Sequence, residues 1–389
     1  MARSRAEQQL ILLSAGTAAR REATCEQAGR LMREVDWSEL AETLRLRKLL
    51  PVLGPRILEL AQGSASDRFA SAVQEAVESG RRQGTFLQLV CLRLIRMLAD
   101  AGICSSALKG PLLGEAIYGD PGRRLSGDID LLIAPEQLWA AVEVARGLGY
   151  GTPTDHVESN GLPLLHFSLV HERGELPPLE LHWRIHWYER SFAHERLLPH
   201  AVESLDGWRP APADEFAALL LFYARDGFLG LRLACDLSAW WDAFGAELRP
   251  GALDELVCLY PALVRVLPAA ARVAEKVVGI PTTHTIADAP KPGLRERAAE
   301  RLANPDPRTS EPQLHADMGL IDGLLAPPGG FGAFVRRQVL LPREVLEERA
   351  QLTQERRGSS RLGYGARVLV RYGLTSARLL YTPERLHFT

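Results

Sequence analysis

Two aspartates separated by one apolar residue stand directly before an aliphatic run. Asp128 and Asp130 flank Ile129, and the aliphatic residues 131–133 follow. Side chains alternate along a strand, so a strand over 128–133 would direct both carboxylates to the same side. Like charges held side by side repel each other unless a cation lies between them. Pairs of divalent metal ions fill this role in sites for displacement at phosphorus, so the pattern predicts phosphoryl or nucleotidyl transfer.

A third carboxylate and a basic turn accompany this pair. Glu180 lies in an alternating segment over 179–185, which predicts a strand with polar residues on one face. Three convergent carboxylates suit Mg²⁺, which prefers oxygen ligands and keeps positions free for water and phosphate. Lys109-Gly110 precedes Pro111 at a predicted strand-to-helix junction. Backbone N–H groups and a lysine can hold a phosphate at such a junction.

The spacing of apolar residues indicates the elements that must position these groups. Residues 1–100 favour helices, and the last helix is expected to bury a stripe formed by Leu89, Val90, Leu94, Met97 and Leu98. Gly102 is expected to follow the end of that helix. Short strands and helices then alternate. The strands are expected over 103–108, 128–133, 165–170 and 179–185, and the helices over 111–118 and 135–147.

The rest of the chain favours helices again. One is expected from Pro212, with Asp214 as its cap, and another over 231–244, whereas 281–315 predicts a long connection. The fold class is therefore α+β, a small mixed β-sheet core with helical N-terminal and C-terminal regions. The expected parts are an N-terminal helical region (1–84), an α/β core (85–210), a helical region packed on the core (211–280), and a linker with a C-terminal helical region (281–389).

Composition limits which binding partners and which cellular compartment are expected. The 389 residues carry a formal net charge of −2, which argues against a broad, sequence-independent grip on nucleic acid. No run approaches the roughly 18 apolar residues of a transmembrane helix. The N-terminal stretch favours an amphipathic helix over a signal peptide. Five scattered cysteines without metal spacing are typical of a reduced protein, so a cytoplasmic location is expected.

Several short motifs occur in a specific order along the chain. They are Leu108-Lys109-Gly110-Pro111, Tyr118-Gly119-Asp120-Pro121-Gly122, Arg124, Asp128-Ile129-Asp130-Leu131-Leu132 and Glu180-Leu181-His182-Trp183-Arg184. Together they resemble the largely uncharacterised bacterial nucleotidyltransferase-like family, which belongs to the polymerase-β-type nucleotidyltransferase superfamily. The resemblance covers roughly residues 85–245 and extends more weakly towards the C-terminus.

The resemblance implies a role for each matching acid. Asp128 and Asp130 would be paired catalytic metal ligands, and Glu180 would bind one metal and accept the proton of the attacking hydroxyl. The implied cofactor is Mg²⁺, with Mn²⁺ as a possible substitute. The implied reaction moves a nucleoside monophosphate from a nucleoside triphosphate to an acceptor hydroxyl and releases pyrophosphate. The acceptor stays open among a small molecule, a peptide, a tRNA end and a partner protein.

The resemblance also implies which residues bind the nucleotide. Lys109-Gly110 stands where better-known members of the superfamily carry Gly-Ser, in the loop that holds the β- and γ-phosphates. Arg124 would face the phosphates or the leaving group. His182 and Arg184 share the predicted strand face of Glu180 and would line the nucleotide site.

The acids and Lys109 also have purely structural interpretations. Asp128 and Asp130 could end a solvated strand, and Glu180 could be an exposed strand residue. Lys109 could form a surface salt bridge. A chain of this kind would be a degenerate nucleotidyltransferase fold that binds a partner or a nucleotide without turnover.

The remaining candidates have structural alternatives of their own. Arg124 could pair with Asp120 or Asp128, and His182 could be a satisfied structural group. Asp236 could cap its helix, pair with Arg232 or approach the nucleotide. The basic residues of the C-terminal part could form a solvated helix face or contact RNA. These are Arg336, Arg337, Arg356, Arg357, Arg361, Arg367 and Arg371.

Overall fold

A computed structural model describes most of the chain. It covers residues 5–153, 164–189, 191–204, 207–287, 291–303 and 311–339, with Ala366, Leu369, Val370, Gly373 and Leu374. Most of the basic C-terminal part therefore lies outside the described residues, including Arg356, Arg357, Arg361, Arg367 and Arg371.

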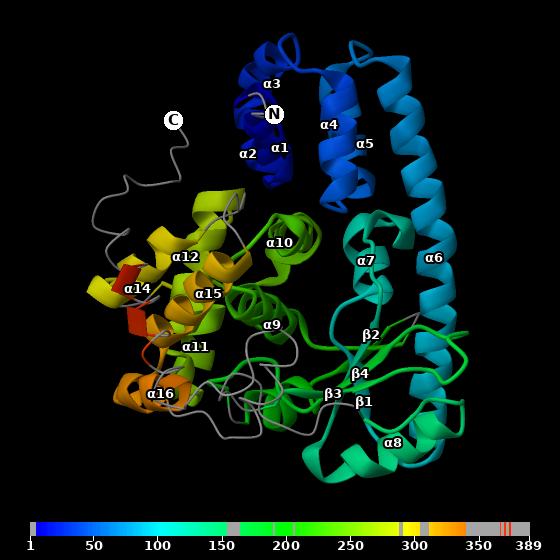
Figure 1. Cartoon of the computed structure of the whole chain (residues 1–389), viewed down its shortest axis with the longest axis vertical. Coiled ribbons are helices and arrows are strands. Elements are labelled where there is room, and N and C mark those ends of the chain that lie inside the picture. Colours follow the sequence, from blue (N-terminus) through cyan, green and yellow to red (C-terminus); the bar gives the residue numbers. More distant parts are fainter. Residues whose placement is uncertain are drawn as a thin grey trace.

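Six helices form the N-terminal region, as predicted. They are α1 (Arg5–Ala15), α2 (Ala18–Ala23), α3 (Cys25–Leu31), α4 (Trp37–Leu46), α5 (Leu50–Ala61) and α6 (Asp67–Asp100). The 34-residue α6 starts where Ser66 Oγ accepts a hydrogen bond from Phe69 N–H. It runs along one side of the molecule, from the N-terminal helices to the sheet (Figure 1). Its buried stripe contains Val90, Leu94 and Leu98, but the prediction for Leu89 was wrong, since that residue is 63% exposed.

The central sheet has four short strands and mixed directions. They are β1 (Ser105–Ala107), β2 (Ile129–Ile133), β3 (His166–Leu169) and β4 (Leu179–His182), in the order β1-β2-β4-β3. β2 and β4 are parallel, whereas β1 and β3 each run antiparallel to their neighbour. The small mixed sheet with helical regions at both ends confirms the predicted α+β class.

The two faces of the sheet have different chemistry. Ile129, Leu131 and Leu181 point to one face and pack in an apolar core with α6 and α8 (Leu138–Arg146). Alternation therefore directs Asp130 and Glu180 to the other face. This polar face meets α9 (Pro212–Arg225), whose Phe222 contacts side chains of the sheet. The apolar residues of β2 thus fix the direction in which its acid points.

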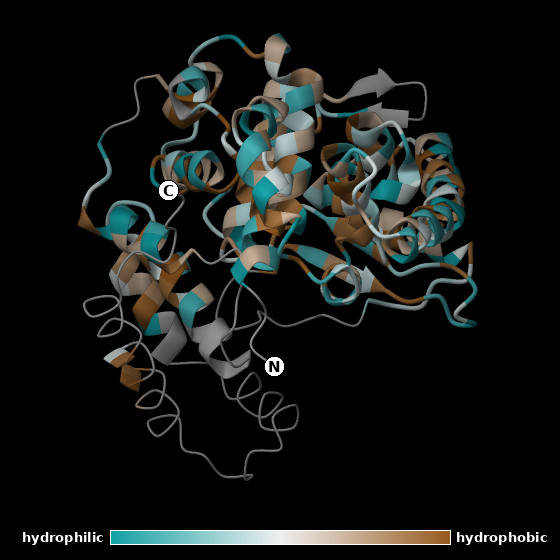
Figure 2. Cartoon of the chain, turned by 90° about the horizontal axis from the view of Figure 1, so that it is seen from above, coloured by the Kyte–Doolittle hydropathy of each residue, from teal (hydrophilic) through white to brown (hydrophobic). Residues whose placement is uncertain are grey.

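Helices dominate the described residues from 212 to 339. After α9 come α10 (Arg232–Phe244), α11 (Ala252–Leu259), α12 (Val266–Val278), α13 (Thr282–Thr285), α14 (Leu294–Leu302), α15 (Glu311–Leu325) and α16 (Gly330–Val339). Most helices carry both apolar and hydrophilic residues, brown and teal in Figure 2, as helices that bury one side do. No described helix is long and apolar enough to cross a membrane.

Two predictions for this part were wrong. Asp214 does not cap α9, because the cap residue is Ala211 and Asp214 lies in the first turn, paired with Arg196 at 2.7 Å. The segment 281–315 is not a plain connection, because α14 lies within it. The α14 sequence LRERAAERL consists of strong helix formers, and its Glu300 binds Arg272 of α12 at 2.6 Å.

Close backbone packing against α6 positions the loop that leads to β2. This loop begins with a 3₁₀ turn, η1 (Pro121–Arg123), after α7 (Pro111–Tyr118). A Cβ atom on Gly80 would clash with the carbonyl oxygen of Gly122, and one on Gly84 would lie 2.6 Å from that of Pro121. Glycine at these two positions of α6 therefore lets the loop lie directly on the helix.

We expect Gly80→Ala to destabilise the protein by about 1–3 kcal/mol, because neither backbone can move away cheaply. Gly29→Ala is the matched control, since a Cβ on Gly29 of α3 meets nothing within 4 Å. Gly29→Ala should stabilise the protein by about 0.5–1 kcal/mol, because alanine has the higher helix propensity. Urea unfolding of both variants measures the difference, and equal effects would contradict the packing argument.

Candidate active site

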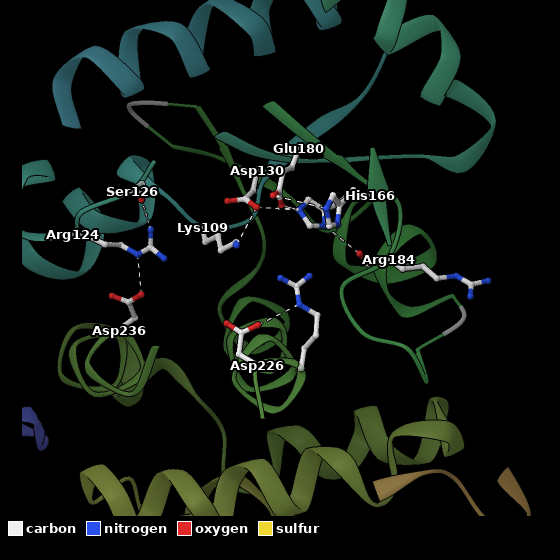
Figure 3. Close-up of polar contacts among 11 residues, drawn as sticks. Lys109, Arg124, Ser126, Asp130, His166, Glu180, Arg184, Asp226 and Asp236 are labelled. Atoms are coloured by element: carbon white, nitrogen blue, oxygen red, sulfur yellow. Dashed lines mark hydrogen bonds and ion pairs between the residues drawn. The ribbon is translucent and has the colours of Figure 1, made fainter. Parts of the chain in front are cut away.

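Three carboxylates converge on the polar face of the sheet. Asp128 directly precedes β2, Asp130 lies within it, and Glu180 lies on β4. The parallel register pairs Asp130 with Glu180. Each of the three acids offers an oxygen within 4.8 Å of the others. Figure 3 shows Asp130 and Glu180 side by side with Lys109 and His166 around them. The sheet therefore brings together the three acids that the sequence suggested.

The environment shifts the pKa of each acid. Burial raises the pKa of Asp128, and the neighbouring charge of Asp130 raises it further. Burial would also raise the pKa of Asp130, but Lys109 and the hydrogen bond with His182 hold it well below its usual range. Burial opposes ionisation of Glu180 too, and the hydrogen bond with His182 lowers its pKa on balance. Asp130 and Glu180 are therefore ionised at neutral pH.

The site fits a divalent cation with oxygen ligands. Asp130 is 1% exposed, and its Oδ2 atom has no hydrogen-bond partner among the described residues. A buried carboxylate oxygen without a partner costs about 1–3 kcal/mol or more. An ion held by Asp128, Asp130 and Glu180 would relieve both that cost and the mutual repulsion of the acids.

Lys109 is the cation closest to this cluster. Its Nζ atom lies 3.1 Å from Asp130 Oδ1 and 5.1 Å from the ring centroid of Phe222. The ion pair is largely buried, so it is not the surface salt bridge considered above. Gly110 follows with φ +97°, a conformation that favours glycine, and α7 begins at the next residue. The turn thus sets Lys109 and a helix N-terminus beside the acids.

Arg124 lies in a separate, buried group. Its Nε donates to Asp236 Oδ2 at 2.8 Å, and Tyr118 Oη donates to Asp236 Oδ1 at 3.0 Å. Figure 3 shows this group apart from the carboxylate cluster. Arg124 therefore pairs with neither Asp120 nor Asp128, the two partners suggested by the sequence. Asp120 instead caps η1 and binds Arg81. Asp236 pairs with Arg124 of the loop before β2, and not with Arg232.

His182 and Arg184 occupy different places. His182 is fully buried, and its Nε2 atom lies 3.0 Å from both Asp130 Oδ1 and Glu180 Oε2. The side chain of Arg184 points away from the carboxylates in Figure 3, although its carbonyl oxygen contacts His182. Of these two predicted nucleotide ligands, His182 therefore lies against the acids themselves.

Sequence reasoning missed two residues near the cluster. Arg225 of α9 lies with its Cζ atom 4.7 Å from the ring centroid of Phe222, the ring that Lys109 also contacts. Its Nη1 atom is buried and without a partner among the described residues. The imidazole of His166 on β3 lies beside that of His182, with ring centroids 4.7 Å apart and ring planes tilted by 41°. Burial, and then His182, lower the pKa of His166 to about 4, so its imidazole is neutral at neutral pH.

A signal existed for only one of them. Alternation along the strand expected over 165–170 sets His166 on the face opposite Phe167, but nothing in the sequence indicates that this strand pairs with β4. Arg225 ends a helix whose packing partner is set by tertiary structure, so no local pattern marked it.

The fold and the site define a nucleotidyltransferase-like protein. A sequence model of the family described as uncharacterised nucleotidyltransferase matches residues 33–277, and the chain belongs to this family. The match confirms the resemblance and includes Lys109, the three acids and α9. No curated protein and no solved structure matches the chain.

Removing Arg124 tests whether its role is structural. We expect Arg124→Met to cost about 3–5 kcal/mol in unfolding free energy, because it leaves Asp236 charged and buried. The double variant Arg124→Met/Asp236→Leu should cost far less than the sum of the single changes. Urea unfolding provides the measurement.

The exposed pair of Arg45 with Glu42 serves as the control, and Arg45→Met should change stability by less than about 0.5 kcal/mol. An Arg124→Met protein of unchanged stability that binds triphosphate more weakly would instead support the phosphate-binding prediction.

Proposed function

We propose that this protein is a Mg²⁺-dependent nucleotidyltransferase. It would move a nucleoside monophosphate from a nucleoside triphosphate to an acceptor hydroxyl and release pyrophosphate. The observation that carries the proposal is the convergence of Asp128, Asp130 and Glu180 beside Lys109, with Asp130 Oδ2 buried and without a partner among the described residues. Family membership supports the same reaction class.

The three acids would hold the metal, with Mn²⁺ as an alternative to Mg²⁺. When bound, the metal would supply positive charge at the reacting phosphate and at the attacking hydroxyl. Asp128 and Glu180 are partly exposed, whereas Asp130 is buried, so an acceptor can reach either of the first two acids. We assign Glu180 the acceptance of the hydroxyl proton on a carboxylate oxygen, for which its lowered pKa keeps it ionised.

Lys109 and Arg225 would bind the β- and γ-phosphates. Both cations contact Phe222, from the sheet side and from α9 respectively, so a triphosphate lying over the acids would meet two positive charges. Gly110, the residue before α7, has no side chain that could accept hydrogen bonds from the first N–H groups of this helix. These groups can therefore donate to a phosphate oxygen. Arg225 thus takes the place that the sequence suggested for Arg124 and Arg184.

The proposal leaves four classes of acceptor, namely a small molecule, a peptide, a tRNA end and a protein. It places the protein in the cytoplasm. The parts expected at 1–84 and 211–280 would shape the acceptor site on either side of the core. Of these, α9 and α10 reach the polar face and the loop before β2.

One observation favours a second function, binding of a nucleotide or partner without turnover. The Lys109 ammonium already neutralises Asp130 at 3.1 Å, and His182 lies between two of the acids. The arrangement of the acids can therefore be stable without a metal ion. The two functions differ in whether triphosphate is consumed.

We expect Asp130→Asn to abolish transfer. Pyrophosphate release would be measured with Mg²⁺ and each triphosphate, in the presence of candidate acceptors or cell extract. Loss of one electrostatic contact to a transition state costs roughly 10²–10³ in rate elsewhere, and loss of this metal ligand should cost at least as much. The side-chain shape is kept, so circular dichroism should show an intact fold.

Two further variants make the assay specific. Asp100→Asn is the matched control, because Asp100 is exposed at the end of α6, and it should leave the rate unchanged. Arg225→Ala should raise KM for the triphosphate more than it lowers kcat. Wild-type protein that binds no triphosphate with Mg²⁺ or Mn²⁺ would sink the transferase proposal.

A further inference from the structure

A second set of potential ligands adjoins the three acids. His166 on β3 lies directly opposite His182 on β4, and Glu180 is two residues away on the same face as His182. Each of these three side chains offers an atom within 4.8 Å of the others. His166 Nε2 lies 3.9 Å from Glu180 Oε1. The antiparallel register thus places two imidazoles and one carboxylate around a single point.

Both ring nitrogens of His182 lie against oxygen atoms. Its Nδ1 atom is 3.4 Å from the carbonyl oxygen of Arg184, which can only accept a hydrogen bond. Its Nε2 atom is 3.0 Å from one oxygen of Asp130 and from one oxygen of Glu180. A metal ion bound at Nε2 would lie between this nitrogen and the two carboxylates, where it would offset their mutual repulsion.

Metal-binding histidines show this arrangement. Such a histidine usually donates its other ring N–H to a backbone carbonyl or a carboxylate, which fixes the tautomer that binds the metal. Two atoms nearby also lack partners among the described residues, Nδ1 of His166 and Oδ2 of the almost completely buried Asp130. Asp130 Oδ2 also supports the three-acid site, whereas the unpaired Nδ1 atom of His166 belongs to this second set and indicates a missing ligand there.

We propose that His166, His182 and Glu180 bind a first-row transition-metal ion, such as Mn²⁺, Co²⁺ or Zn²⁺, beside the three-acid site. Imidazole ligands suit these ions, whereas Mg²⁺ takes oxygen ligands almost exclusively. The two sites share Glu180. Three protein ligands leave coordination positions free for water or for a substrate oxygen.

The proposal concerns the same face as the proposed function but does not need transfer to occur. Its test therefore reads metal binding directly. Full-length protein freed of metal with EDTA is titrated with Co²⁺ alone, and binding is followed by calorimetry and by the visible absorption of Co²⁺. His166→Gln should weaken the affinity for Co²⁺ at least roughly 10- to 100-fold, which is the cost of losing only the hydrogen-bond partner of a metal ligand.

Two other variants serve as comparisons. His200→Gln removes an exposed imidazole that contacts Asp214, and it should leave the Co²⁺ affinity unchanged. Asp128→Asn removes a ligand of the three-acid site alone, and it should weaken the affinity for Co²⁺ less than His166→Gln does. Co²⁺ binding that depends on Asp128 but not on His166 would overturn the proposal.

A measurement on the wild-type protein keeps the test independent of any variant's folding. Pulsed electron paramagnetic resonance of Mn²⁺ bound to the full chain should detect coupling to imidazole nitrogen, and its absence would overturn the proposal. Nitrogen coupling in a protein that releases no pyrophosphate would remove the transferase function and leave this site standing. Pyrophosphate release without nitrogen coupling would support the transferase function and overturn the histidine site.

Discussion

Repulsion among Asp128, Asp130 and Glu180 is the constraint on which the rest of the site depends. The parallel pairing of β2 with β4 sets two of these acids opposite each other, on a face that α9 covers. Water screens buried charges poorly, so the fold must supply positive charge there. Lys109 does so, and its ammonium and His182 both contact the same oxygen of Asp130. The other oxygen of Asp130 is left to a ligand, which is the basis of the proposed metal site.

The surrounding elements hold this charged cluster in position. The apolar residues of β2 pack on α6 and α8, and this packing directs Asp130 to the opposite face. The loop before β2 is anchored at three points. Gln83 Nε2 donates to the carbonyl of Ser126 at 2.9 Å, Arg124 binds Asp236 of α10, and η1 lies on the glycines of α6. Asp128 at the end of this loop is therefore held in position by packing and by polar contacts of the protein itself.

Local patterns predicted the elements and the three acids because both follow from short-range rules. Alternation in 128–133 and 179–185 sets the strand faces, and the Asp-x-Asp spacing sets two carboxylates on one of them. Pairings between distant residues could not be predicted in this way. Arg124 is 112 residues from Asp236, and nothing near either residue indicates the other. Leu89 fits an apolar stripe by spacing, but the helix face that it occupies has no partner among the described residues.

The same limit applies to the basic residues of the site. Arg225 lies beside Phe222 and near His166 only because α9 packs across the sheet, an arrangement that depends on the helical region behind it. The three acids and Lys109 could thus be singled out from local sequence patterns, whereas Arg225 could not, because its position depends on contacts between layers.

The central claim is that the three acids hold a divalent ion beside a bound triphosphate. The most direct measurement is an anomalous difference map from crystals grown with Mn²⁺ and a non-hydrolysable triphosphate. The account predicts a Mn²⁺ peak at about 2.1–2.3 Å from oxygens of Asp128, Asp130 and Glu180, with the phosphates against Lys109 and Arg225. Crystals without such a peak, in which Lys109 and Asp130 remain paired and no nucleotide is bound, would contradict it.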